Sequence, residues 1–120
     1  MQPILKINVT TETTGEFIVP KDWEHDFLGG ASLAARILYP QLTKELDPLS
    51  PESPLLFLNG PLTGTSGPTT GRFVICGKSP ATNLWAESNI GGFWGPELRK
   101  VGYDGLWIMG KAQSQSYLWI

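Results

Sequence analysis

The sequence predicts an α+β domain that is rich in antiparallel sheet and has a few short helices. Two observations carry this prediction: strand-like apolar segments outnumber helical ones, and glycines and prolines interrupt the chain before any helix grows long. With 14 glycines and 10 prolines, these two residue types make up a fifth of the 120 positions, well above their average usage. The hydrophobic fraction of 41% and the length suit one globular domain with a core.

Two strands and two helices are expected in the N-terminal part of the chain, over residues 4–9, 16–19, 21–27 and 31–38. The two strands flank a polar stretch with turn residues, which predicts a hairpin. In the second helix, Leu33, Ala34, Ile37 and Leu38 recur at helical spacing. Pro40 then ends the helix, because proline cannot donate the next backbone hydrogen bond.

Four further strands and one helix are expected downstream, over residues 55–58, 72–76, 105–109 and 116–120 for the strands and 96–101 for the helix. Pro96 would occupy the first helical position, where its missing N–H is not needed, and Gly102 would end the helix. Ten of the fourteen glycines lie between Gly60 and Gly105. This part of the chain is therefore expected to carry most of the loops.

Charge and composition exclude several functions. A net charge of −2 provides no basic surface for nucleic acid or an anionic membrane, no apolar run approaches the roughly 20 residues of a membrane span, and the start of the chain lacks a signal-peptide layout. A cytoplasmic protein is expected.

With Cys76 as the one cysteine and His25 as the one histidine, neither an intramolecular disulfide nor a four-cysteine or zinc site can form from this chain. Redox chemistry would have to come from a cofactor or from another part of a longer chain.

Two glycine-rich segments follow the strand at 55–58 and are candidates for anion binding. In residues 59–65 (NGPLTGT), glycines allow close backbone approach, and free N–H groups with threonine hydroxyls can bind an anion. In residues 67–72 (GPTTGR), Arg72 beside small hydroxyl residues suits a phosphate, because its planar fork makes paired hydrogen bonds. The alternatives are a tight connection after a buried strand and a surface arginine at the start of the next strand.

A third candidate segment covers residues 88–99 (SNIGGFWGPELR). Gly91 and Gly92 run into a helix start, whose free N–H groups and dipole favour an anion. Phe93 and Trp94 would wall a flat heterocycle. The alternative is a structural helix start with core aromatics.

Taken in order, these segments resemble the N-terminal domain of the aldehyde ferredoxin oxidoreductase family of tungsten enzymes. The resemblance runs nearly from end to end, and each piece alone is weak while their order and spacing are specific. The segments include KINVT (6–10), FLGG (27–30), DPLSPE (47–52), GPLTGT (60–65), GR (71–72), KSP (78–80), GPEL (95–98), GYDG (102–105) and GKA (110–112).

The resemblance implies that residues 1–120 are a tungstopterin-cradling N-terminal domain, incomplete at its C-terminal end. The family's enzymes bind tungsten through the dithiolenes of two pterins, hold a 4Fe-4S cluster, oxidise aldehydes to carboxylic acids and pass electrons to ferredoxin. By the family pattern, Arg72 would contact the phosphate region of the bis-pterin cofactor, and Gly91 and Gly92 would allow its close approach. Asn89 would hold a magnesium ion that bridges the pterin phosphates, through its backbone carbonyl. These roles require the loops around 60–72 and 89–95 to converge in space.

The resemblance also leaves alternatives open. The family's cluster-binding cysteines and acid-base residues belong to later domains, so the chain alone is expected to be inactive. Ala31 and Ser32 stand where the family commonly has arginine, which is compatible with a divergent subfamily, including a relative acting on aromatic acyl thioesters. A stand-alone module that binds a phosphorylated small molecule, an inactive gene fragment and a homo-oligomer also remain open.

Overall fold

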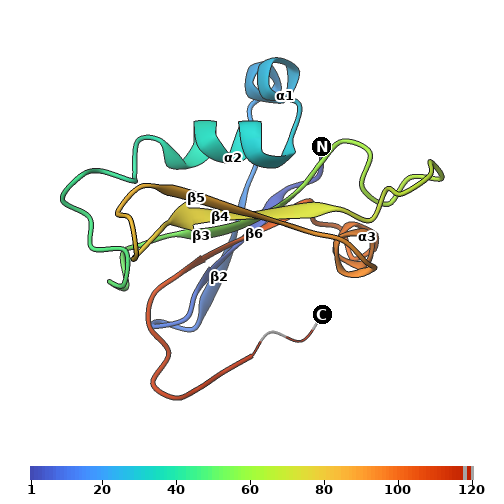
Figure 1. Cartoon of the computed structure of the whole chain (residues 1–120). Coiled ribbons are helices and arrows are strands. Elements are labelled where there is room, and N and C mark those ends of the chain that lie inside the picture. Colours follow the sequence, from blue (N-terminus) through green and yellow to red (C-terminus); the bar gives the residue numbers. More distant parts are fainter. Residues whose placement is uncertain (118, 120) are drawn as a thin grey trace.

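A six-stranded sheet, in the order β2-β1-β6-β3-β4-β5, forms the body of the molecule in the computed structural model, which describes residues 1–117 and 119 (Figure 1). Four of the five strand pairings in these residues are antiparallel, and β1 and β6 are parallel. The strands are β1 (Ile4–Asn8), β2 (Thr13–Phe17), β3 (Leu55–Asn59), β4 (Phe73–Lys78), β5 (Trp85–Ile90) and β6 (Gly105–Met109), and the helices are α1 (Lys21–Phe27), α2 (Gly30–Leu38) and α3 (Trp94–Lys100). The predicted α+β class and the N-terminal hairpin are confirmed.

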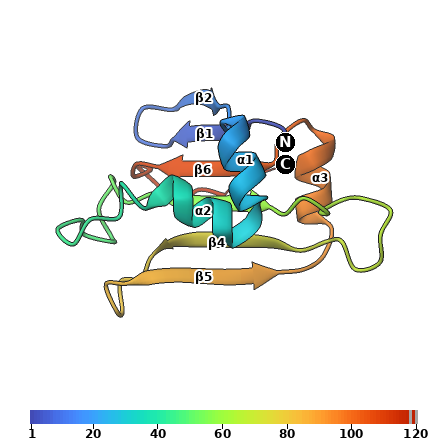
Figure 2. The same cartoon turned by 90° about the horizontal axis from the view of Figure 1, so that it is seen from above.

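One face of the sheet is covered by α2, and α1 packs against α2 on the same side of the sheet, farther from the strands (Figures 1 and 2). The apolar positions of α2 predicted from helical spacing are buried, and they pack on side chains from β3, β4 and β6. The buried residues of this core include Leu33, Ala34, Ile37, Leu38, Leu56, Leu58, Val74, Cys76 and Trp107. Full burial of a leucine or isoleucine side chain stabilises a fold by roughly 1.5–3 kcal/mol, so this layer holds the sheet in shape.

The helix α3 packs at one end of the sheet, through aromatic side chains. Trp94 lies with its ring centroid 4.4 Å from that of Phe73 and 5.5 Å from that of Phe57. Phe73 is the first residue of β4 and is buried. The start of β4 is thereby joined to the start of α3, and the loops that precede these two elements are brought to the same end of the molecule.

The structure corrects several predicted boundaries. The strand expected at 16–19 is β2, which ends at Phe17, and α3 begins at Trp94, so that Pro96 is its third residue. Proline is tolerated there because the N–H groups of the first turn have no partner within the helix. In the strand expected at 116–120, Ser116, Tyr117 and Trp119 are not in a strand, and the other two positions lie outside the described residues.

The sequence analysis missed β5. All of its residues except Ala86 are exposed, and they follow no apolar alternation. The strand forms at the edge of the sheet because its backbone pairs with β4, with Phe73 opposite Ile90 and Lys78 opposite Trp85. This pairing carries Gly91 and Gly92 back to the start of β4.

The longest helix in the described part of the chain, α2, has nine residues. None of the helices found there has the length and apolar character needed to cross a membrane.

Candidate functional site

Two loops meet at the end of the sheet where β4 begins and β5 ends. A Cβ atom added to Gly71 would overlap the carbonyl oxygen of Gly92, so the two backbones are in direct contact. A Cβ added to Gly64 would lie 3.3 Å from the Cα atom of Pro96. The predicted convergence of the loops around 60–72 and 89–95 is confirmed.

Between these loops lies a hollow of about 530 Å³, which we call the glycine-threonine hollow. It is lined by Gly64, Thr65, Gly67, Thr69, Thr70, Gly71, Arg72, Gly91, Gly92, Phe93 and Pro96. Arg72 is the one charged residue in this lining, and no acidic side chain lies among them. The hollow therefore favours an anion over a cation.

Arg72 lies directly before β4 and is exposed. No hydrogen bond or ion pair within the described residues engages its guanidinium group, and its side chain borders the hollow. A guanidinium presents N–H donors in a planar fork that matches the oxygens of a phosphate. Its donors are thus available for a ligand.

Gly91 and Gly92 present bare backbone to the hollow. A Cβ atom added to either residue would have no other atom within 4 Å, apart from its chain neighbours. Gly92 has a φ of +113°, a conformation that side-chain-bearing residues rarely adopt. Ligand atoms can therefore come close to this backbone, as the family pattern implies.

Two of the three threonine hydroxyls that line the hollow play a different part from the one expected. The Oγ1 of Thr65 donates to the carbonyl of Leu62 at 2.9 Å, and the Oγ1 of Thr70 contacts the carbonyls of Thr65 at 2.9 Å and Gly67 at 3.1 Å. These hydroxyls stiffen the loop itself. The polar groups left for an anion are the Arg72 guanidinium, the bare glycine backbone and the hydroxyl of Thr69, which makes no hydrogen bond within the described residues.

The structure places Asn89 apart from the other predicted site residues. It lies within β5, opposite Val74, and is exposed, whereas the lining of the hollow begins two residues later at Gly91. Among the described residues, no group of three or more His, Cys, Asp or Glu side chains could hold a metal ion. Magnesium binding through the Asn89 carbonyl stays a prediction.

Phe93 and Trp94, expected to wall a heterocycle together, point in different directions. Phe93 is 85% exposed at the rim of the hollow, while Trp94 packs into the aromatic cluster under α3. The dipole of α3 adds little, because the helix has seven residues and carries Glu97 in its first turn. Only Phe93 is placed to touch a ligand in the hollow.

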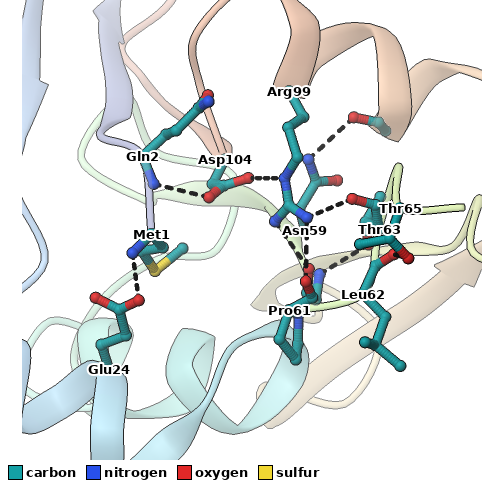
Figure 3. A network of polar contacts seen from close by, with 12 residues as sticks. Met1, Gln2, Glu24, Asn59, Pro61, Leu62, Thr63, Thr65, Arg99 and Asp104 are labelled. Atoms are coloured by element: carbon teal, nitrogen blue, oxygen red, sulfur yellow. Dashed lines mark hydrogen bonds and ion pairs between the residues drawn. The ribbon is translucent and has the colours of Figure 1, made fainter.

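A partly buried polar network, which the sequence analysis did not find, supports the loop after β3 (Figure 3). Arg99 Nε donates to Asp104 Oδ1 at 2.6 Å, and the same guanidinium donates to the carbonyl oxygens of Gly60 at 3.0 Å, Pro61 at 3.2 Å and Thr63. Asp104 is 2% exposed. The only signal in the sequence was an arginine five residues before an aspartate in a glycine-flanked turn, which is too common a pattern to predict these contacts.

The single cysteine and histidine lie outside the lining of the hollow. Burial, together with the negative charge of Glu87, raises the pKa of the Cys76 thiol to about 12, so the reactive thiolate is scarce at neutral pH. His25 is exposed and lies 2.9 Å from Asp26. Neither side chain therefore contributes to the candidate site.

Comparison with known proteins shows which family the chain belongs to. The sequence model of the family described as "Aldehyde ferredoxin oxidoreductase, N-terminal domain" matches residues 4–120 of this chain. The chain belongs to the aldehyde ferredoxin oxidoreductase family. It is 40% identical to the tungsten-containing aldehyde ferredoxin oxidoreductase of Pyrococcus abyssi, over 98% of this chain and 19% of that protein. The chain thus spans about a fifth of the length of this relative, and it matches the N-terminal domain of the family.

Two proteins with other names are similar to this chain at comparable identity. The aliphatic sulfonate oxidoreductase, WOR-like subunit, of Pyrococcus furiosus is 39% identical over 98% of this chain and 19% of its own length. The solved active-site complex BamBC of benzoyl coenzyme A reductase, in complex with 1,5-dienoyl-CoA, contains a chain that is 34% identical to this one. The two structures match with a TM-score of 0.90 over 94% of this chain and 17% of the chain in the complex. The solved complex therefore contains a domain of nearly the same shape as this chain.

Proposed function

We propose that this chain is the cofactor-binding domain of a tungsten bis-pterin, iron-sulfur oxidoreductase and that the glycine-threonine hollow receives a phosphate group of the pterin cofactor. The observation that carries the proposal is Arg72, which has no partner for its guanidinium among the described residues and borders a lining without acidic side chains. The names of the tungsten-containing relatives support the choice of cofactor.

The residues of the hollow fit a phosphate group in charge and in shape. Arg72 supplies a positive charge and a fork of donors. Gly91 and Gly92 leave open the space that side chains would fill, and Phe93 offers an exposed ring beside which a planar pterin can lie. Magnesium at the Asn89 carbonyl belongs to the same proposal, because a hard cation takes oxygen ligands and would bridge neighbouring phosphates.

Arg72, Gly91 and Gly92 would hold the cofactor, which when bound would supply the two-electron chemistry for oxidising an aldehyde to a carboxylic acid, with a 4Fe-4S cluster and ferredoxin as the route for the electrons. Regions present in the longer relatives would hold that cluster. The part of this chain is to bind and orient the cofactor, because Arg72, Gly91 and Gly92 line the hollow, whereas the buried Cys76 lies outside it. The 120-residue chain alone is expected to have no aldehyde-oxidising activity.

A reductase acting on an aromatic acyl thioester is a second candidate function, favoured by the likeness to the benzoyl coenzyme A reductase complex. The cofactor-binding role of this domain would be the same in both. We favour the aldehyde, because four relatives named tungsten-containing aldehyde ferredoxin oxidoreductase are 36–40% identical over at least 97% of this chain.

The proposal is tested with a pair of ligands that differ only in the phosphate: 6-hydroxymethylpterin phosphate and 6-hydroxymethylpterin. Fluorescence anisotropy of the pterin should report binding of the phosphorylated form to the chain. Arg72→Ala should weaken that binding at least about tenfold, the equivalent of 1.4 kcal/mol. Arg36→Ala is the matched control, because Arg36 lies outside the lining of the hollow, 3.8 Å above the ring of Trp23, and its loss should leave binding unchanged. Equal affinity for the two pterins would refute the proposal.

A further inference from the structure

The backbone of Arg72 is held by a buried threonine. The Oγ1 of Thr63 donates to the carbonyl oxygen of Arg72 at 2.6 Å and accepts from the N–H of Gly60 at 3.0 Å. Thr63 is 3% exposed. Hydrogen bonds sheltered from water are stronger than exposed ones, so this hydroxyl is a firm link between the loop after β3 and the residue that borders the hollow.

Thr63 is in turn held by Arg99 (Figure 3). The guanidinium of Arg99 donates to the carbonyl of Thr63 and spans two more carbonyls of the same turn, those of Gly60 and Pro61. Asp104 aims the guanidinium: its Oδ1 accepts from Arg99, and its Oδ2 accepts from the backbone N–H of Gln2 at 2.8 Å. The donors of a guanidinium form a rigid planar fork that fixes the arrangement of its acceptors, whereas a lysine ammonium is a compact charge with three rotatable donors.

The neighbours of Arg72 in the chain are fixed as well. Gly71 lies against the carbonyl of Gly92, and Phe73 is buried against Trp94. The backbone of Arg72 is thus anchored before, at and after the residue, while its side chain is exposed. A charged group held in place before the ligand arrives binds more tightly, because less conformational entropy is lost on binding.

We propose that Thr63 and Arg99 are positioning residues, which hold the backbone of Arg72 so that its guanidinium faces the glycine-threonine hollow. This inference rests on the proposed function, since it takes the phosphate of a pterin as the ligand of Arg72. The residues form a relay: Asp104 orients Arg99, Arg99 holds Thr63, and Thr63 holds Arg72.

The test compares Thr63→Val, which keeps the shape of the side chain and loses the hydroxyl, with Thr63→Ser, which keeps the hydroxyl. In the ¹⁵N-labelled chain without ligand, Thr63→Val should lower the amide order parameters of Gly71 and Arg72, and Thr63→Ser should leave them near the wild-type values. Affinity for 6-hydroxymethylpterin phosphate should fall about tenfold in Thr63→Val and be kept in Thr63→Ser. Thr13→Val, on β2 at the opposite edge of the sheet, is the control and should change neither measurement.

Should Thr63→Val fail to fold, Arg99→Lys provides the same readings, because it keeps the positive charge beside Asp104 and loses the fork. Unchanged order parameters at Gly71 and Arg72 in the folded variant would overturn the positioning role. So would a loss of affinity as large in Thr63→Ser as in Thr63→Val. A wild-type chain that binds both pterins equally would instead refute the proposed function, while the order parameters measured without ligand would still decide the role of Thr63.

Discussion

A cationic side chain lies at each end of β4, and the two differ in burial and in hydrogen bonding. Lys78, the last residue of the strand, is 8% exposed, and its Nζ donates to the carbonyls of Thr43 at 2.7 Å, Lys44 at 3.2 Å and Leu46 at 2.7 Å. Arg72, just before the strand, is exposed, and no partner for its guanidinium lies within the described residues. All three hydrogen bonds of an ammonium are taken up at one end, and a whole guanidinium is available at the other.

This difference shows how a structural cation is told from a binding one. Lys78 ties the loop after α2 to the sheet, and three hydrogen bonds are the most that a lysine ammonium can donate. Arg72 contributes nothing comparable to the fold, although its backbone is firmly anchored through Thr63. A charged side chain on a fixed backbone and without a partner is typical of a binding site.

The largest effect is expected on removing the buried cation. Lys78→Met should lower the free energy of unfolding by about 2–3 kcal/mol, because it removes three charge-assisted hydrogen bonds and leaves carbonyl groups without partners. Arg72→Met should change that free energy by less than about 0.5 kcal/mol, as expected for an exposed side chain. Urea unfolding followed by tryptophan fluorescence measures both. Equal losses in the two variants would contradict the division between structural and binding cation.

A smaller effect is expected at the glycines that flank the two cations. Gly71→Ala should lower the free energy of unfolding by about 1–3 kcal/mol, because its methyl group would overlap the Gly92 carbonyl and push the two loops apart. Gly77→Ala should cost less, since its Cβ would lie 3.2 Å from the carbonyl of Pro54 and a small shift relieves the contact. Thermal unfolding of the two variants checks the order. A Gly77→Ala variant less stable than Gly71→Ala would show that the loop contact is not tight.

The smallest effect on stability is expected at Gly91. Its Cβ would project into open space, so Gly91→Ala should change the free energy of unfolding by less than about 0.5 kcal/mol. Gly92→Ala should lower the free energy of unfolding by about 1–2 kcal/mol more than Gly91→Ala does, because residue 92 has a φ of +113°, which alanine rarely adopts. Gly91→Trp should nevertheless weaken binding of 6-hydroxymethylpterin phosphate, since it fills the approach to the hollow. Unchanged affinity in Gly91→Trp would show that the ligand does not use this side.

Sequence reasoning succeeded where the signal was local. The hairpin of β1 and β2, the apolar face of α2 and the strands at 55–58 and 105–109 follow from short apolar runs, turn residues or helical spacing within a few residues. The strand β5 was missed because its residues carry no such pattern, and backbone pairing with β4 forms it. The network of Arg99 and Asp104 was missed because all of its contacts except the one between these two residues join positions 36 to 102 residues apart in the chain.

The sequence by itself determined the fold class, the family and the three loop segments with the chemistry to meet an anion, because composition, glycine placement and motif order are properties of the chain. The tertiary structure alone decided which of these groups share a hollow. It joined Arg72 with Gly91 and Gly92, turned Trp94 into the core and Phe93 outward, and left Asn89 on the edge strand. The physical reason is that such contacts depend on strand pairing and packing between distant residues, and no local pattern encodes them.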